Sequence, residues 1–206
     1  MTGGGLDPSA RFRLVASERV YDGYFKIIRY RLVHQLFAGG EGPELVREVF
    51  ERGRAVAVLP YDPDRDEVVL IEQFRSGAIG VDDDPWLIET IAGIVEPKES
   101  LEEVAHREAQ EEAGLDLYNL RHITRFFASP GGSTETVDLF LARIDASKAG
   151  GLFGLADEGE DVKVHVLSYD AAVDWLKQGR IRVGTTIIAL QWLMLNRDRL
   201  KAAISW

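Results

Sequence analysis

Alternating hydrophobic and polar positions predict a chain rich in strands. Alternation begins at Arg19 and continues to Phe37 with many Tyr, Phe, Ile and Val residues, and the glycines and proline within 39–43 interrupt it. Further strand-like segments follow at Leu45–Phe50, Arg54–Pro60, Glu67–Phe74, Trp86–Ala92, His122–Ala128, Glu135–Ile144 and Val162–Leu167. The first of these segments and the alternating stretch before it predict a small antiparallel meander.

Apolar spacing of three and four residues predicts a helix over Leu101–Ala113. Ser100 and Glu103 have the S-x-x-E form of a capping box, in which each residue satisfies a backbone N–H at the helix start. Gly114 is placed to end the helix, because glycine readily adopts the left-handed conformation found there. Both limits of this helix are therefore predicted.

Two more helices are predicted near the end of the chain, at Asp170–Lys177 and Thr185–Leu200. The apolar residues of the second helix are expected to pack in the core and not to form a cofactor site. They are Ile187, Ile188, Leu190, Trp192, Leu193 and Leu195.

The chain is predicted to have three parts. Residues 1–10 are glycine-rich and expected to be disordered, residues 11–52 form the meander, and residues 53–206 form the main domain. A small meander has no core of its own, so its apolar face must pack on something else. A second copy of the chain is one candidate.

Composition excludes several classes of function. Lys and Arg total 24 and Asp and Glu total 34, so the net charge is 24 − 34 = −10, which disfavours nucleic acid and anionic membranes as partners. The absence of cysteine excludes disulfides, thiol catalysis and cysteine zinc sites. Neither a signal peptide nor a run of about 18 apolar residues is present, so we expect a cytoplasmic protein that does not bind a membrane.

Three carboxylates on the first predicted helix suggest metal chemistry. Glu108, Glu111 and Glu112 stand at i, i+3 and i+4, which places them on one helix face. Their repulsion costs roughly 0.2–0.5 kcal/mol per pair, and a hard divalent cation such as Mg²⁺ would offset it. The alternative is a solvated acidic face that keeps the protein soluble.

The full spacing around this helix resembles the Nudix box of the Nudix hydrolases. Every defined position of that pattern is matched: Gly93, Glu99, Arg107, Glu108, Ala109, Glu111, Glu112, Gly114 and Leu115. The resemblance implies an α+β protein of the α/β/α sandwich type, the Nudix fold, with a mixed central β-sheet and here an N-terminal antiparallel β-subdomain. It also implies cleavage, dependent on Mg²⁺ or Mn²⁺, of a nucleoside diphosphate linked to another group.

In that family, Glu108 and Glu112 correspond to the principal metal ligands. Glu111 would assist them, and Ala92 would offer its backbone carbonyl. The resemblance assigns a supporting role to Gly93 and to an ion pair between Glu99 and Arg107, which would hold the loop against the helix.

Resemblance to the bacterial ADP-ribose pyrophosphatase branch of this family extends beyond the box. The similar segments are 36–40, 47–53, 67–75, 85–89, 128–135, 154–161 and 189–193. Enzymes of this branch split ADP-ribose into AMP and ribose 5-phosphate. Their N-terminal strands are exchanged across a homodimer and help to form the adenosine site, which implies the same for this chain.

The resemblance also suggests substrate contacts in two loops. Pro130, followed by Gly131, lies where a proline marks ADP-ribose specificity, and Glu135 would lie beside the substrate; an ordinary turn is the alternative. Arg75 could clamp the diphosphate with its planar guanidinium, or form only a surface ion pair.

The meander would hold the adenine. Tyr24 or Phe25 could stack on the base, with Arg47 contributed by the other subunit.

The general base is expected in the acidic segment 154–161, although such a segment is often simply solvated. Alignment with the branch assigns the base to Glu158 and a further metal contact to Glu160. A water held between Mg²⁺ ions and deprotonated by Glu158 would then attack the adenosine-side phosphorus, and the loop would close over the substrate.

Two other functions stay open at this point. The box recognises a diphosphate and not the terminal group, so GDP-mannose or ADP-glucose could be the substrate. A non-catalytic sensor of ADP-ribose is the other alternative, but the box is intact and neither a helix-turn-helix segment nor a basic patch is visible.

Overall fold

The computed structural model describes residues 11–81, 84–155 and 159–202. The chain forms two compact units. The first consists of the chain up to Gly53 together with the segment Phe127–Glu135, and the second consists of Arg54–Phe126 and the chain from Thr136 onwards. The expectation of disorder for residues 1–10 lies outside the described residues. The division into a meander of residues 11–52 and a main domain of residues 53–206 stays a prediction.

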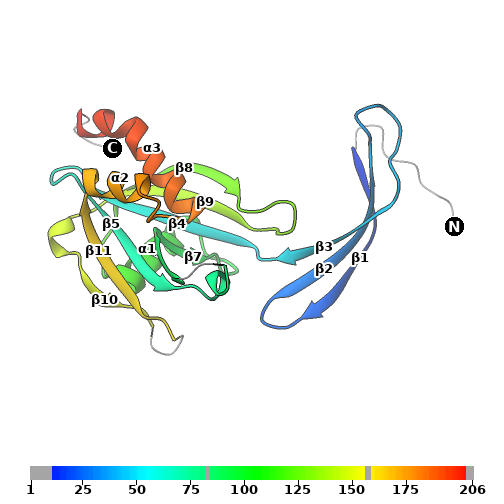
Figure 1. Cartoon of the computed structure of the whole chain (residues 1–206), viewed down its shortest axis with the longest axis horizontal. Coiled ribbons are helices and arrows are strands. Elements are labelled where there is room, and N and C mark those ends of the chain that lie inside the picture. Colours follow the sequence, from blue (N-terminus) through cyan, green and yellow to red (C-terminus); the bar gives the residue numbers. More distant parts are fainter. Residues whose placement is uncertain (1–10, 82–83, 156–158, 203–206) are drawn as a thin grey trace. The chain divides into compact units, whose positions relative to one another are not determined.

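The first unit is a three-stranded antiparallel sheet in the order β1-β2-β3 (Figure 1). Its strands are β1 (Phe12–Asp22), β2 (Lys26–His34) and β3 (Leu45–Glu51). Among the described residues of this unit, Ile28 and Val33 are the only buried hydrophobic side chains. The sheet therefore has almost no core of its own.

The start of the first strand differs from the prediction. Alternation suggested Arg19, but β1 begins at Phe12, and a turn at Gly23 separates β1 from β2. The β1–β2 register shifts between Leu14 and Ala16 and again between Arg19 and Tyr21. Such irregularities change which face a side chain occupies, so they hide the two-residue period.

The second unit contains an eight-stranded mixed sheet in which six strands follow the order β10-β11-β5-β4-β9-β8. Its strands are β4 (Arg54–Asp62), β5 (Glu67–Phe74), β6 (Trp86–Glu89), β7 (Ile91–Ile94), β8 (Tyr118–Phe127), β9 (Thr136–Arg143), β10 (Gly151–Phe153) and β11 (Val162–Ser168). β4 runs parallel to β9 and antiparallel to β5 and β7. β6 pairs with β5.

Helices cover both faces of this sheet (Figure 1). α1 (Leu101–Ala113) packs on the face that carries Val56 and Val58 of β4. α2 (Tyr169–Lys177) and α3 (Gly184–Ala202) cover the face that carries Leu59 and Tyr61. Two short 3₁₀ helices lie at Ser76–Ala78 and Ala146–Lys148. The predicted α/β/α sandwich is confirmed. It has two hydrophobic cores because side chains along each strand point alternately to the two faces of the sheet, and both faces are covered.

The first helix has the predicted limits. Ser100 accepts a hydrogen bond from the Glu103 backbone N–H at 3.2 Å, and Glu103 accepts one from the Ser100 backbone N–H at 2.7 Å. Gly114 ends the helix with a φ of 62°. The position of α1 directly after β7 brings its carboxylates next to that strand.

The predicted core face of the last helix is partly wrong. Leu190 and Leu193 are buried, and Ile187, Ile188 and Trp192 are half-buried against the same core, but Leu195 is 83% exposed. Because each residue turns a helix by about 100°, Leu195 stands about 200° from Leu193.

Two strand predictions also need correction. The segment Trp86–Ala92 is divided at Thr90 into β6 and β7, and β10 was not expected. No helix in the described part of the chain is long and apolar enough to cross a membrane.

Candidate active site

The Glu108 carboxylate lies directly against the backbone of Gly93. A Cβ atom on residue 93 would overlap the Oε1 atom of Glu108, so glycine at this position makes room for the carboxylate. The Glu108 side chain is only 14% exposed. β7 and α1 therefore form a cradle that a larger residue at position 93 would fill.

Glu112 lies one helical turn further along α1 and contacts the same strand. Its Oε2 accepts a hydrogen bond from the Ala92 backbone N–H at 3.0 Å, and the residue is 3% exposed. Ala92 and Gly93 of β7 thus contact the two carboxylates predicted to bind metal.

Burial changes the protonation of both carboxylates. Removal from water raises the pKa of Glu112 to about 8 and that of Glu108 to about 7, because the charged form is poorly solvated there. The hydrogen bond from Ala92 lowers the pKa of Glu112, and the charge of Arg107 lowers that of Glu108, but burial outweighs both. A cation placed between them would favour the ionised forms.

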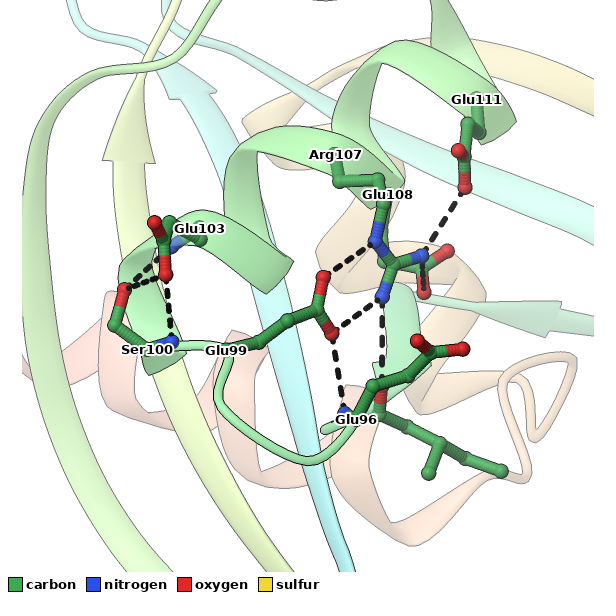
Figure 2. Close-up of polar contacts among 8 residues, drawn as sticks. Glu96, Glu99, Ser100, Glu103, Arg107, Glu108 and Glu111 are labelled. Carbon is green, nitrogen blue, oxygen red and sulfur yellow. Dashed lines mark hydrogen bonds and ion pairs between the residues drawn. The ribbon is translucent and has the colours of Figure 1, made fainter.

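Arg107 joins the loop before α1 to the helix (Figure 2). Its Nε and Nη2 atoms donate to the two carboxylate oxygens of Glu99, at 3.0 and 3.2 Å. Its Nη1 atom donates to Glu108 at 2.7 Å and to Glu111 at 3.2 Å, and Nη2 contacts the Ile94 carbonyl at 3.4 Å. This geometry contains the ion pair that the resemblance implied, together with two contacts to predicted metal ligands.

The donor set fits a hard divalent cation. Magnesium prefers oxygen ligands, is commonly bound by one or two carboxylates and keeps several waters. Within residues 11–81, 84–155 and 159–202, no group of three or more His, Asp or Glu side chains is arranged to hold a metal by itself. Glu108 and Glu112 would thus need a backbone carbonyl, water or substrate oxygens to complete the coordination.

Arg75 follows β5 and is held by Glu89 of β6. Its Nε atom lies 3.1 Å from each carboxylate oxygen of Glu89, and its Nη2 atom lies 2.7 Å from Oε2. The alternative considered for Arg75, an ion pair, is therefore present, but with a buried carboxylate. Sequence reasoning missed Glu89, whose signal was a charged residue at the end of the apolar Trp-Leu-Ile segment.

The predicted adenine contacts Tyr24, Phe25 and Arg47 belong to the first unit. Tyr24 is 87% exposed and stacks edge-on against Phe25 with ring centroids 4.8 Å apart. Arg47 donates to the Val46 carbonyl at 2.8 Å.

Arg52 was not predicted as a site residue, yet its guanidinium lies 5.3 Å from the centre of the Phe25 ring. It also lies 3.3 Å from Glu135. In the sequence, Arg52 was indicated only by its place in the segment 47–53, which resembles the ADP-ribose pyrophosphatase branch. Pro130 and Gly131 lie in the exposed turn that precedes Glu135.

The predicted general base, Glu158, lies outside the described residues. Glu160 is described, and its carboxylate is 3.5 Å from the Leu155 backbone nitrogen. After burial, the negative charge of Glu160 is among the further causes that raise the pKa of Glu108 and Glu112. Its charge is therefore close enough to act on the carboxylates of α1.

Comparison with known proteins identifies the family. A model described as the NUDIX domain matches residues 51–186, which is well over half of the chain. The chain belongs to the Nudix family, and the expectation from the box is confirmed.

Curated relatives cover almost the full length. An ADP-ribose pyrophosphatase of Escherichia coli (strain K12) is 47% identical over 188 residues, or 91% of this chain and 90% of the relative. One from Haemophilus influenzae is 43% identical over 196 residues, covering 94% and 89%. A GDP-mannose pyrophosphatase of Salmonella typhimurium is 33% identical over 191 residues, covering 91% and 97%.

A solved structure described as an ADP compounds hydrolase has a TM-score of 0.72 to this chain. It covers 94% of this chain and 98% of its own, at 19% identity, so it supports the fold alone.

Proposed function

We propose that this protein hydrolyses ADP-ribose to AMP and ribose 5-phosphate, using Mg²⁺ or, in its place, Mn²⁺. The observation that carries the proposal is the buried pair Glu108 and Glu112, held against β7 by Gly93 and Ala92. In a chain 47% identical to an ADP-ribose pyrophosphatase, this pair supplies the oxygen ligands that a diphosphate hydrolase needs.

Glu108, Glu112 and the Ala92 carbonyl would hold the metal, with Glu111 and Glu160 as further ligands. The metal, when bound, stabilises the charge that develops on the diphosphate and lowers the pKa of the attacking water. Arg107 and Glu99 keep Glu108 in place by fixing the loop on the helix.

Proton transfer requires a base of the chain itself. Glu158 takes the proton of the attacking water, whose oxygen forms a bond to the adenosine-side phosphorus. The bond between that phosphorus and the bridging oxygen of the diphosphate breaks, and ribose 5-phosphate leaves with the bridging oxygen. Arg75 binds the diphosphate with charge-assisted hydrogen bonds, which are strongest when a guanidinium contacts two oxygens.

Substrate recognition is proposed to use the first unit. Tyr24 or Phe25 stacks on the adenine, and Arg47 comes from the partner of a homodimer. In the loop before β9, Pro130, Gly131 and Glu135 contact the substrate. The support is the small number of buried side chains in β1–β3, since such a sheet needs another surface to pack on.

A second candidate is a GDP-mannose pyrophosphatase. The 33% identity to such an enzyme favours it. The chemistry of the box would be unchanged, and only the recognition of the base and of the terminal sugar of the substrate would differ. A non-catalytic sensor has less support, since the carboxylates of the box are all present. A cytoplasmic location and the absence of nucleic acid partners stay predictions.

Incubation of the purified protein with Mg²⁺ and equal concentrations of ADP-ribose, ADP-glucose and GDP-mannose tests the proposal. Chromatography should show AMP and ribose 5-phosphate as the main products. Glu112→Gln should lower turnover by about 10³-fold or more, while Glu102→Gln, on the exposed side of the same helix, should not. A preference for GDP-mannose would support the second candidate, and binding of ADP-ribose without AMP release would support the sensor.

A further inference from the structure

We propose that Glu89 is a positioning residue that orients the guanidinium of Arg75 toward the diphosphate of the substrate. The inference rests on the proposed function, because it assigns to Glu89 a part in the binding of that diphosphate. Glu89 does not contact the substrate itself; it acts through Arg75.

The hydrogen bonds to Glu89 use one edge of the Arg75 guanidinium. Nε contacts both carboxylate oxygens at 3.1 Å, and Nη2 contacts Oε2 at 2.7 Å. Among the described residues, no hydrogen bond from Nη1 of Arg75 is found. Since a guanidinium carries five N–H groups in a planar fork, the edge formed by Nη1 and Nη2 stays available for two phosphate oxygens.

Burial shows which partner is fixed. The Glu89 side chain is 9% exposed, whereas that of Arg75 is 43% exposed. Glu89 stands opposite Ile71 in the β5–β6 ladder, and the Gln73 side-chain amide lies 3.5 Å from its Oε2. The carboxylate is therefore anchored in the sheet, and the arginine reaches from it toward solvent.

The pair lies on the same side of the sheet as the carboxylates of α1. Ile71 belongs to the core beneath α1, and Glu89, its partner in the ladder, shares its face. Although burial lowers the pKa of Arg75, the charges of Glu89, Glu112 and Glu160 together raise it. The charge of Arg75 is thus close to the groups proposed to act on the diphosphate.

An arginine without this carboxylate would sample many orientations. Its long side chain loses considerable rotamer freedom when it is held, and a group displaced by about 1 Å can cost about 10²-fold in rate. Glu89 would reduce that cost before the substrate arrives. A purely structural ion pair would instead stabilise the fold without affecting how Arg75 binds phosphate.

A double-mutant cycle separates these roles. Glu89→Gln keeps the size of the side chain but removes its charge, and Arg75→Met keeps an apolar stem without donors. We expect Glu89→Gln to lower kcat/KM for ADP-ribose by about 10- to 100-fold, and to cause no further loss when Arg75→Met is already present.

Glu72→Gln is the matched control. Glu72 is a half-buried carboxylate on β5, next to Gln73 but on the other face, where it lies 2.7 Å from the His165 ring. Activity close to that of the unmutated protein is expected. Glu89→Asp retains the charge but retracts it by one methylene, and should give a smaller loss with an intact fold, which thermal unfolding would verify.

Binding of ADP, measured by calorimetry, supplies a readout other than turnover. Glu89→Gln and Arg75→Met should weaken ADP binding, and their effects should not add. An undiminished effect of Glu89→Gln in the Arg75→Met background, or no effect in either assay, would overturn the inference. If the unmutated protein and Glu72→Gln release no AMP from ADP-ribose, the proposed function fails, whereas coupled losses of ADP affinity would still support the role of Glu89.

Discussion

Gly93 and Glu108 occupy neighbouring positions that leave no room for a side chain at residue 93. A Cβ atom there would overlap the Oε1 atom of the carboxylate. The glycine of the box is thus explained by the space that Glu108 needs, and not by a left-handed backbone, because Gly93 is not among the glycines with positive φ.

Gly93→Ala should therefore displace Glu108 and lower turnover by about 10²-fold or more, since a proposed metal ligand would be moved from its position. The fold should persist, because the carboxylate can turn away. Steady-state kinetics and thermal unfolding measure the two effects. Gly77→Ala is the control, as nothing lies within 4 Å of a Cβ at that position. Full activity of Gly93→Ala would contradict this explanation.

Divalent cations should stabilise the protein more at pH 8 than at pH 6. Burial raises the pKa of Glu112 to about 8 and of Glu108 to about 7, above the value of about 4.3 for an unfolded chain. The contribution of these two groups to the stability of the folded protein is fully present below the pKa of the unfolded chain. It is lost as the pH rises through the folded pKa values of about 7 and about 8. A cation offsets that loss only where the carboxylates ionise.

Thermal unfolding in EDTA and in Mg²⁺, at pH 6, 7 and 8, measures this linkage. The increase in Tm caused by Mg²⁺ should be larger at higher pH. Glu112→Gln should make this increase depend less on pH. An increase that is equal at all three pH values would show that these carboxylates do not control cation binding.

Asp66→Asn should lower the free energy of unfolding at pH 7 by about 1 kcal/mol, because the ion pair is partly exposed and screened. The hydrogen bond from Arg197 holds the pKa of Asp66 below its ordinary value, and further bonds come from Tyr61 and Lys201. This stabilisation is present above the unfolded pKa and is lost as the pH falls through the folded one. Asparagine tolerates the positive φ of 57° at this position.

Urea unfolding at pH 7 and pH 3 provides the measurement for Asp66→Asn. The difference from the unmutated protein should shrink at pH 3. Asp64→Asn is a suitable control, since Asp64 pairs with Arg143 at 2.7 Å but is 78% exposed. Equal losses for the two variants would mean that the contacts of Asp66 carry no special weight.

Thr186→Val should destabilise the protein by about 1–3 kcal/mol, because it leaves a buried N–H without an acceptor. The Thr186 hydroxyl accepts a hydrogen bond from the Thr90 backbone N–H at 2.9 Å, and both residues are buried. Thr185→Val, at a half-buried neighbour on α3, provides the comparison. Chemical denaturation should show a loss only for Thr186→Val, and the absence of one would indicate that the N–H finds another partner.

Local spacing was enough to predict α1 and its carboxylates. Ser100 and Glu103 contact each other across one helical turn, and Glu108 and Glu112 share a face, because a helix places residues three and four apart side by side. The box pattern therefore identified the family, and it predicted a metal-binding face on α1 without any tertiary contact.

Only the tertiary structure decided how distant residues meet. The pairing of Arg75 with Glu89, fourteen residues apart, depends on the β5–β6 register, and the contact of Glu112 with Ala92 depends on where α1 packs. The exposure of Leu195 likewise depends on which side of α3 faces the sheet. Such contacts depend on how the whole sheet and its helices assemble. The spacing of hydrophobic residues along the sequence indicates only which residues of one element share a face.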